Sequence, residues 1–328
     1  MTVIVTGGAG YIGAHVVRLL NQAGQKVVVV DDLSTGDAAR IGGAPLVAMD
    51  IAEPGASDRL AQVLGDYGAT SVIHFAARKQ VGESVQRPTW YFAQNVGGMT
   101  NLLDAMERTR TDRLVFSSSA AVYGQPDVGI VQEKNPTVPI NPYGQTKLAC
   151  EWLSADAAVS WGLRVVALRY FNVAGAGAPD LGDPAALNLV PMVLERLAAG
   201  RPPAIFGQDY PTPDGTCVRD YIHVQDLARA HIDSIAYLDR EDRPYQSFNV
   251  GTGVGSSVKE VIEEIGRVSG LDVTPEIMPR RLGDPAELVG DPARITNVLG
   301  WSAKYGLSQI IESAWEAWQA GPNRIEMQ

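Results

Sequence analysis

The sequence predicts an α/β protein with a doubly wound parallel (Rossmann) sheet and a smaller, discontinuous α/β substrate domain. Three observations support this fold class. Short β-branched runs alternate with longer helical patterns up to about residue 174. A glycine-rich turn separates the first strand pattern from the first helical pattern. Beyond that region the composition changes to long loops rich in glycine, proline and aspartate, which is typical of functional loops.

The alternating patterns define the expected elements one by one. Several strand patterns are apolar on both faces, as in buried parallel strands. We expect strands at Val3–Val5, Lys26–Val30, Leu46–Met49, Ser71–His74, Arg113–Ser117 and Arg164–Arg169. We expect helices at Ile12–Ala23, Asp58–Tyr67, Gln94–Arg108 and Tyr143–Trp161, with a later helix over Ile222–Leu238.

The later part of the chain divides the predicted domains. The strand-like stretch SFNVG follows the helical pattern at Ile222–Leu238, and we expect it to return to the first sheet. The predicted sheet domain therefore covers residues 1–174 plus about 222–250. The predicted smaller domain covers residues 175–221 and 251–328.

Composition excludes several classes of function. The net charge of −10 argues against a nucleic-acid surface, and no apolar run approaches the ~20 residues that span a membrane. The first residues lack the basic segment of a signal peptide. The two cysteines, Cys150 and Cys217, form no CxxC motif, which favours a reducing cytoplasm. The four histidines form no HxxxH or HExxH motif, so no metal site is expected.

The first glycine-rich turn predicts a dinucleotide site. Gly8, Gly10 and Gly13 fit GxGxxG, and Gly7, Gly10 and Gly13 also fit GxxGxxG. Glycine permits a close approach of the backbone to a pyrophosphate, and the following helix supplies amides and the positive end of its dipole. The position between a strand and a helix makes this pattern more specific than glycine spacing alone.

Acidic residues at the next strand ends indicate which dinucleotide is bound. Asp31 ends the second strand, 18 residues after Gly13. A carboxylate at this place accepts hydrogen bonds from the ribose hydroxyls and repels a 2′-phosphate, which favours NAD over NADP. Asp50 follows the third strand, where it could contact the adenine or simply serve as a cap or turn residue. Phe75, Ala76, Ala77 and Lys79 follow the fourth strand at the same expected edge.

A tyrosine and a lysine predict acid/base chemistry. Pro142 is a plausible helix start, so Tyr143 and Lys147 share one helical face at i, i+4. A phenol is a poor base at pH 7 because its ordinary pKa is about 10. A nearby cation and the helix N-terminus both favour the phenolate. Ser119, at the end of the fifth strand, could hydrogen-bond the same reacting oxygen.

These motifs resemble a known family. TGGAGYIG, SSSAAVYG, NPYGQTK and RYFNVAGA are similar to the extended short-chain dehydrogenase/reductase family. HFAARKQVGESVQRPTWY and FGQDYPTPDGTCVRDYIHVQDLA resemble, more narrowly, its UDP-glucose 4-epimerase branch. The resemblance extends from Val3 to about Trp301. One departure is Gln94 in QNV, where the family usually has asparagine.

The resemblance implies roles for individual residues. Tyr143 is the expected acid/base, Lys147 its electrostatic partner, and Ser119 a hydrogen-bond partner of the sugar 4-oxygen. NAD is expected to contact Gly7, Gly10, Tyr11, Ile12, Gly13, Asp31, Asp32, Ser34, Thr35, Gly36, Asp50, Ile51, Phe75, Ala76, Ala77, Lys79, Asn95, Ser117, Tyr143, Lys147, Tyr170 and Phe171. The UDP-sugar is expected to contact Lys79, Ser119, Tyr143, Phe171, Asn172, Asn188, Leu189, Ala204, Ile205, Phe206, Arg219, Tyr221, Arg281, Asp284 and Leu288.

The implied reaction is C4 epimerisation of a UDP-hexose through a 4-keto sugar, with retained NAD. Leu288 stands where the family's pocket lies near the sugar C2 substituent, so an N-acetylhexosamine is an alternative substrate; equally, Leu288 could be ordinary packing. A 4,6-dehydratase is disfavoured because Ala120 and Ala121, not an acidic pair, follow Ser119. A UDP-uronic acid epimerase and a non-catalytic NAD-binding protein remain rival interpretations. The family's helix pairing implies a homodimer.

Overall fold

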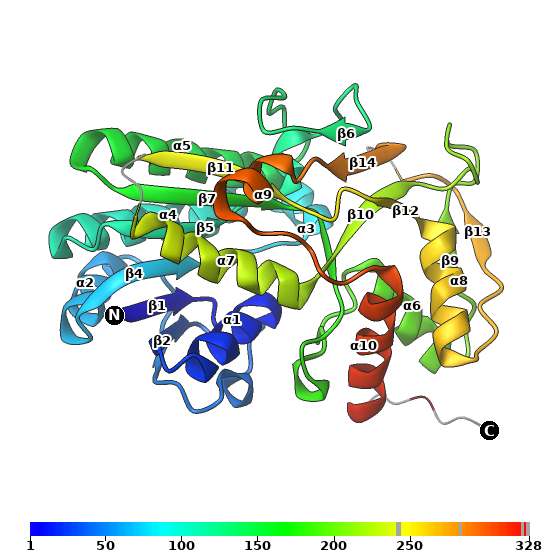
Figure 1. Ribbon diagram of the computed structural model, residues 1–328, viewed down its shortest axis with the longest axis horizontal. Coiled ribbons are helices and arrows are strands. Elements are labelled where there is room, and N and C mark those ends of the chain that lie inside the picture. The colour runs from blue at the N-terminus through cyan, green and yellow to red at the C-terminus, as the bar shows by residue number, and fades with distance from the viewer. Residues whose placement is uncertain (241–243, 282–283, 323–324, 326–328) are drawn as a thin grey trace. The chain divides into compact units, whose positions relative to one another are not determined.

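A computed structural model describes residues 1–240, 244–281, 284–322 and 325 (Figure 1). The chain divides into two compact units, each assembled from separate stretches. Unit 1 comprises Met1–Gly124, Thr137–Arg169 and Ala228–Phe248. Unit 2 comprises Gln125–Pro136, Tyr170–Leu227 and Asn249–Gln328.

Unit 1 is built on a parallel sheet with the strand order β11-β7-β5-β4-β1-β2-β3. The chain order reverses beside β1, which lies between β2 and β4, and ligands of open α/β sheets bind at such a point. This topology confirms the predicted doubly wound sheet and the return of the SFNVG strand to it. The strands are Thr2–Thr6 (β1), Lys26–Asp31 (β2), Leu46–Ala48 (β3), Ala69–His74 (β4), Arg113–Ser117 (β5), Arg164–Tyr170 (β7) and Tyr245–Val250 (β11).

Helices cover both faces of this sheet. Ile4 and Val72 on the strands share one hydrophobic cluster with helix residues such as Leu60 and Leu102. Val5 faces the other way and is also fully buried, which explains the continuous apolar runs in the sequence. In Figure 1, α1 and α7 lie on the face turned to the viewer. The helices are Tyr11–Gln22 (α1), Ala56–Asp66 (α2), Val81–Gln86 (α3), Pro88–Thr109 (α4), Pro142–Trp161 (α5) and Val224–Leu238 (α7).

Unit 2 combines short strands with a helical layer. One sheet has the order β12-β10-β14-β6 with β8 also pairing with β10, and β13 pairs with β9. Its core joins side chains such as Val190, Ile205, Val261 and Ile310. The elements are Ile130–Val131 (β6), Asn172–Ala174 (β8), Leu189–Ala198 (α6), Ala204–Phe206 (β9), Val218–His223 (β10), Gly255–Ser257 (β12), Val258–Ser269 (α8), Glu276–Met278 (β13), Glu287–Gly290 (β14), Ala293–Leu299 (α9) and Leu307–Ala320 (α10).

Most element ends differ from the sequence-based expectation by one or two residues, and three differences change the assignment of a segment. The helix expected from Ile222 begins at Val224, because Ile222 still pairs with Val173 in the sheet. Helix α4 begins at Pro88, six residues before Gln94, because proline is favoured in the first helical turn. The stretch Gln125–Pro136 belongs to unit 2, where β6 pairs with β14. None of the described helices combines the length and apolar character that a bilayer-spanning segment needs.

Candidate active site

The turn between β1 and α1 requires glycine at two positions. Gly7 has a φ of +72°, and a Cβ atom there would lie 2.6 Å from the backbone nitrogen of Ala76. A Cβ atom on Gly13 would lie 2.3 Å from the carbonyl oxygen of Gly7. Gly10 is the N-cap of α1 and supplies no side-chain cap, so the first helical amides are available to an anion. The turn therefore fits the pyrophosphate of a dinucleotide.

Asp31 ties this turn to the loop after β2. Its Oδ2 accepts a hydrogen bond from the Ala9 amide at 2.9 Å, and its Oδ1 accepts one from the Leu33 amide at 2.8 Å. Burial raises the pKa of this carboxyl above its ordinary value, although the two amide hydrogen bonds oppose the rise. A Cβ atom on Gly36 would lie 2.9 Å from the Cβ atom of Ala9 and 3.1 Å from Asp31 Oδ1, so glycine permits the close approach of this loop.

The other expected cofactor residues follow neighbouring strands of the same sheet. Asp32, Ser34 and Thr35 are exposed after β2, and Lys79 is exposed beyond β4. Asp50 Oδ1 accepts a hydrogen bond from the Ala52 amide at 2.8 Å, so the turn role left open by the sequence is real. Unit 1 also contains Tyr11, Ile12, Ile51, Phe75, Ala76, Ala77, Asn95 and Ser117, whereas Tyr170 and Phe171 belong to unit 2.

The tyrosine, the lysine and the serine lie at adjoining ends of β5 and α5. Tyr143 and Ser119 retain 8% and 9% of their exposed surface, whereas Lys147 is almost fully buried. The Lys147 Nζ donates a hydrogen bond at 2.8 Å to the carbonyl of Ser117, the last residue of β5 before the serine turn. Asn141 caps α5 by accepting a hydrogen bond from the Gly144 amide at 2.9 Å. The helix start thus fixes the backbone from which Tyr143 projects.

Gly144 explains how α5 comes close to the serine turn. A Cβ atom on Gly144 would lie 2.6 Å from the carbonyl oxygen of Ala121. Ala121 belongs to the short turn that begins at Ser119, whose Oγ accepts a hydrogen bond from the Ala121 amide at 3.1 Å. Only glycine after Tyr143 permits this approach. Gly144 was not predicted as a site residue, although it stands inside the motif NPYGQTK.

Burial controls the charge of Lys147. Removal from water lowers the pKa of Lys147 to about 8, while the neighbouring Cys150 and Glu151 act in the opposite direction. The Lys147 ammonium lies 5.9 Å from the centroid of the Tyr143 ring. Lys147 is therefore still mostly protonated at pH 7, at a position where its charge favours ionisation of the neighbouring phenol.

Replacing Lys147 by methionine should leave the NAD-free protein at least as stable at pH 7 while lowering its activity. Below pH 8 the folded protein holds a desolvated cation at a cost of roughly 3 kcal/mol. Between pH 8 and 10.5 the unfolded chain binds this proton and the folded chain does not, so wild-type stability rises with pH. Urea unfolding at pH 7 and 9.5 should show the wild type gaining stability relative to Lys147→Met. An unchanged difference between the two proteins would contradict the assigned pKa.

A buried ionic network behind the site was missed by sequence reasoning. Arg169 on β7 donates two hydrogen bonds to Glu151 on α5, from Nε at 2.9 Å and from Nη2 at 2.6 Å. Ser118 Oγ donates to Glu151 Oε1 at 2.5 Å, next to the expected catalytic Ser119. Glu151 lies one turn beyond Lys147 on the same helix. The spacing of Lys147 and Glu151 can be read from the sequence, but the pairing of Glu151 with Arg169 on β7 cannot.

Part of the expected UDP-sugar site forms one group in unit 2. Arg219 on β10 stands opposite Leu288 on β14 in the parallel register. Its Nη2 lies 3.7 Å from Asp284 Oδ1, and its Nη1 donates to the Val218 carbonyl at 2.8 Å. The Arg281 guanidinium lies 3.8 Å from the centroid of the Phe206 ring. Two arginines and an apolar ring suit a diphosphate and a base.

Other residues that are expected to bind the substrate have structural roles in unit 2. The side chains of Ile205 and Tyr221 are buried in its hydrophobic cluster, and burial raises the pKa of the Tyr221 phenol. Asn172 pairs with Tyr221 in the sheet. Asn188 is the N-cap of α6, and its Nδ2 donates to Asp183 at 2.8 Å. Ala204 begins β9 and Leu189 begins α6. The Phe171 ring packs against Gly290, where a Cβ atom would lie only 2.2 Å from the ring.

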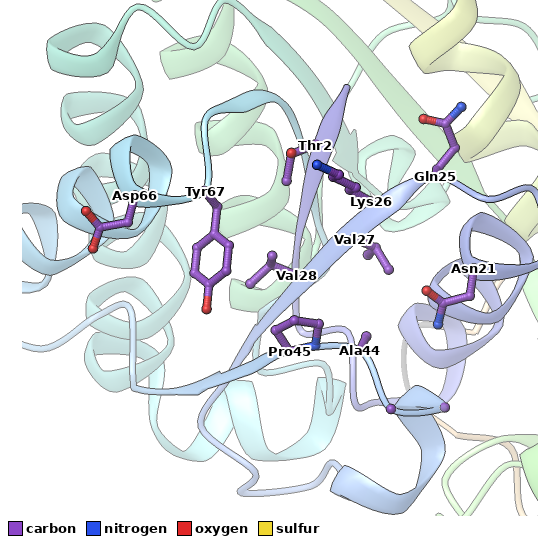
Figure 2. Close-up of a pocket in the computed structure, with 12 residues that line it drawn as sticks. Thr2, Asn21, Gln25, Lys26, Val27, Val28, Ala44, Pro45, Asp66 and Tyr67 are labelled. Carbon is purple, nitrogen blue, oxygen red and sulfur yellow. The ribbon is translucent and has the colours of Figure 1, made fainter.

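A cavity of about 490 Å³ opens at the opposite edge of the sheet (Figure 2). Thr2, Lys26 and Pro45 line it near the starts of β1, β2 and β3, with Asn21 and Tyr67 at its sides. The glycine turn and the serine turn instead follow the ends of β1 and β5. Within the described ranges, no group of three or more histidine, cysteine, aspartate or glutamate side chains could hold a metal ion.

A doubly wound sheet with this glycine turn and a buried tyrosine–lysine pair defines a dinucleotide-dependent enzyme that moves a proton at a hydroxyl or carbonyl oxygen. Comparison with known proteins specifies the class further. The chain belongs to the NAD dependent epimerase/dehydratase family, whose sequence profile matches residues 3–251.

Individual relatives are similar over nearly the whole chain. A UDP-glucose 4-epimerase of Azospirillum brasilense is 47% identical over 322 residues, covering 96% of this chain and 91% of that protein. The crystal structure of UDP-glucose 4-epimerase from Brucella ovis in complex with NAD has a TM-score of 0.90 at 44% identity, covering 95% and 97%. The Stenotrophomonas maltophila enzyme with bound NAD and formylated UDP-arabinopyranose has a TM-score of 0.91 at 42% identity, covering 98% of each chain.

Proposed function

We propose that this protein interconverts UDP-galactose and UDP-glucose by epimerisation at C4, with NAD as a tightly held cofactor. The observation that carries the proposal is the buried Tyr143–Lys147 pair beside the Ser119 turn, on a sheet with a dinucleotide-binding turn. Membership in the NAD dependent epimerase/dehydratase family and the 47%-identical UDP-glucose 4-epimerase support it.

In the proposed mechanism, Tyr143 takes the proton from the sugar 4-hydroxyl and later returns it. Lys147 stabilises the phenolate, and Ser119 donates a hydrogen bond to the same oxygen. When bound, NAD supplies a reversible acceptor for the hydride of C4. A 4-keto sugar that presented its other face would be reduced there to the C4 epimer, with Tyr143 returning the proton to the 4-oxygen. No net oxidation occurs.

The proposed binding residues divide between the two units. The glycine turn, Asp31 and the loops after β3 and β4 are assigned to NAD, since a carboxylate after β2 disfavours a 2′-phosphate. Arg219 and Arg281 are assigned to the diphosphate, and Phe206 to the uracil. The remaining residues keep their sequence-based assignments, with NAD binding assigned mainly to unit 1 and UDP-sugar binding mainly to unit 2.

Incubation of the purified protein with UDP-galactose tests the proposal. We expect UDP-glucose as the product without added dinucleotide, and mass spectrometry of the denatured protein should identify NAD as the released cofactor. A 4-keto-6-deoxy product would instead indicate a dehydratase. Recovery of mainly NADP would overturn the assignment of Asp31.

A second candidate substrate is a UDP-N-acetylhexosamine, because Leu288 stands beside Arg219 in unit 2 and is only partly buried. We expect UDP-galactose to be the better substrate, with measurable turnover of UDP-N-acetylgalactosamine. Leu288→Tyr should lower kcat/KM for the acetylated sugar by roughly tenfold, within the range of one methylene-scale contact, and spare the plain sugar. An equal fall for both sugars would show that Leu288 does not discriminate at C2.

We also propose that the protein is a cytoplasmic homodimer that pairs through α4 and α5. Trp152 and Val159 on α5 are 62% and 85% exposed, and Phe92 on α4 is 39% exposed, so both helices carry exposed apolar side chains for a partner to cover. The two free cysteines fit a reducing compartment. Light scattering should give the mass of two chains, and a monomer at micromolar concentration would contradict the pairing.

A further inference from the structure

The guanidinium of Arg78 joins two loops at the carboxyl edge of the unit 1 sheet. Arg78 belongs to the loop after β4, yet its Nη2 lies 2.7 Å from Asp32 Oδ2 in the loop after β2. Its Nη1 donates to Ser34 Oγ in the same loop. β1 lies between β2 and β4, so this bridge crosses the place where the glycine turn opens.

The bridge also uses the residue that departs from the family pattern. Arg78 Nε donates to Gln94 Oε1 at 3.0 Å, and Gln94 Nε2 donates to Asp50 Oδ2 at 3.4 Å. Asparagine is one methylene shorter than glutamine and would not extend as far from α4. Through Gln94 the bridge therefore also reaches the loop after β3. The side chains of Arg78 and Gln94 together thus link three loops that border the dinucleotide edge.

Hydrogen bonds tie the backbone of Arg78 to α4. The Arg78 amide donates to Asn95 Oδ1 at 2.7 Å, and its carbonyl accepts from Asn95 Nδ2 at 3.0 Å. Asn95 is buried, and its Nδ2 also donates to Thr146 Oγ1 at 2.9 Å. Thr146 lies between Tyr143 and Lys147 on α5. The backbone of Arg78 is therefore anchored to the helix that presents the tyrosine.

The far end of the bridge is more accessible. The side chains of Arg78 and Asp32 retain 21% and 27% of their exposed surface. Asp32 Oδ1 accepts hydrogen bonds from the Ser34 amide at 2.9 Å and from Ser34 Oγ at 2.6 Å. Burial opposes ionisation of Asp32, but the Ser34 hydrogen bonds and the Arg78 charge outweigh it and lower its pKa. The pair is therefore ionised at neutral pH.

We propose that Arg78 is a cofactor-retention residue, whose bridge to Asp32 holds the loops after β2 and β4 together across the dinucleotide edge and slows the release of NAD. An arginine suits this role because its planar fork makes several directed hydrogen bonds at once. The inference rests on the proposed function, in which NAD stays bound between turnovers. Arg78 would thus help to retain the cofactor without taking part in the reaction.

The test compares NAD release from the wild type, Arg78→Met, Asp32→Asn and the double variant. Each protein is loaded with NAD, separated from free NAD, and sampled over time for bound dinucleotide by mass spectrometry. Each single variant should release NAD roughly tenfold faster, the effect expected for one charge-assisted hydrogen bond at a partly exposed site. The double variant should release NAD no faster than either single variant, because both remove the same bridge.

Arg87→Met is the matched control. The Arg87 guanidinium lies 3.8 Å from the Trp90 ring centroid, and that of Arg78 lies 5.4 Å from the same centroid, but Arg87 pairs with Glu83 on α3. Arg87→Met should release NAD at the wild-type rate. High salt should accelerate release from the wild type but not from Arg78→Met, because salt screens a partly exposed ion pair.

Several outcomes would overturn the inference. One is release of NAD from Arg78→Met at the wild-type rate. Another is a double variant in which the effects of the two single variants add, because this would mean that Arg78 and Asp32 contact the cofactor independently. If Arg78→Met fails to fold, Asp32→Asn tests the same bridge from its exposed end. If the wild-type protein retains NADP and Arg78→Met does not, Arg78 would instead bind the 2′-phosphate. A wild type that binds neither dinucleotide would overturn the proposed function itself.

Discussion

Replacement of Tyr143 by phenylalanine is expected to lower kcat for UDP-galactose by at least about 100-fold, the loss typical of a removed acid/base. The substitution removes one oxygen and keeps the ring, so the packing of a side chain that is 8% exposed should change little. Lys147 and its hydrogen bond to the Ser117 carbonyl should also persist, because they do not involve the phenol. Steady-state kinetics together with the bound NAD content measure this effect.

A tyrosine elsewhere in unit 1 provides the control. Tyr67 is 41% exposed and borders the cavity at the opposite edge of the sheet. Tyr67→Phe should therefore leave kcat unchanged. Ser119→Ala should cost less than Tyr143→Phe if Tyr143 alone carries the proton, and about as much if the two hydroxyls relay it. Near wild-type turnover in Tyr143→Phe would remove Tyr143 from the mechanism.

Replacement of Arg169 by methionine is expected to destabilise the NAD-free protein by about 3–5 kcal/mol, the range for breaking a buried ion pair. The Arg169 and Glu151 side chains are 8% and 3% exposed, so the remaining carboxylate would stay away from water. The hydroxyls of Ser118 and Tyr245, which donate to it at 2.5 and 3.2 Å, cannot replace a cation. Denaturant unfolding gives the change in the free energy of unfolding.

The same pair supplies its own control. Arg169→Met combined with Glu151→Gln removes both charges and should recover much of the lost stability. A deficit below about 1 kcal/mol, or a double variant that shows the sum of the two single losses, would contradict a strong buried coupling.

Local sequence patterns were sufficient for the sheet and the cofactor turn. The strand at Val3–Val5 and the glycines after it form a continuous signal, because strand periodicity and turn chemistry depend on near neighbours. The close contact of a Cβ atom on Gly13 with Gly7 gives that signal a steric cause. The pairing of Tyr143 with Lys147 was equally readable, since four residues make one helical turn.

Contacts between distant segments could not be predicted in this way. Arg169 and Glu151 belong to a strand and a helix, and only the fold brings them together. Arg78 reaches Asp32 across β1, and neither residue has a motif that indicates its partner. Ile222 has the apolar character of the helix that follows it, so the strand end there was read as helix. In each of these cases, tertiary pairing decides what the local pattern leaves open.

The most direct test of the account follows the hydrogen at C4 of the sugar. UDP-galactose labelled with deuterium at C4 is converted by the purified protein in the presence of unlabelled free NAD, and the product is examined by mass spectrometry and NMR. We expect UDP-glucose that still carries the deuterium at C4, because the hydride leaves and returns within one binding event. Loss of the deuterium to the free NAD pool, or a product unchanged at C4, would contradict epimerisation by transient oxidation with a retained cofactor.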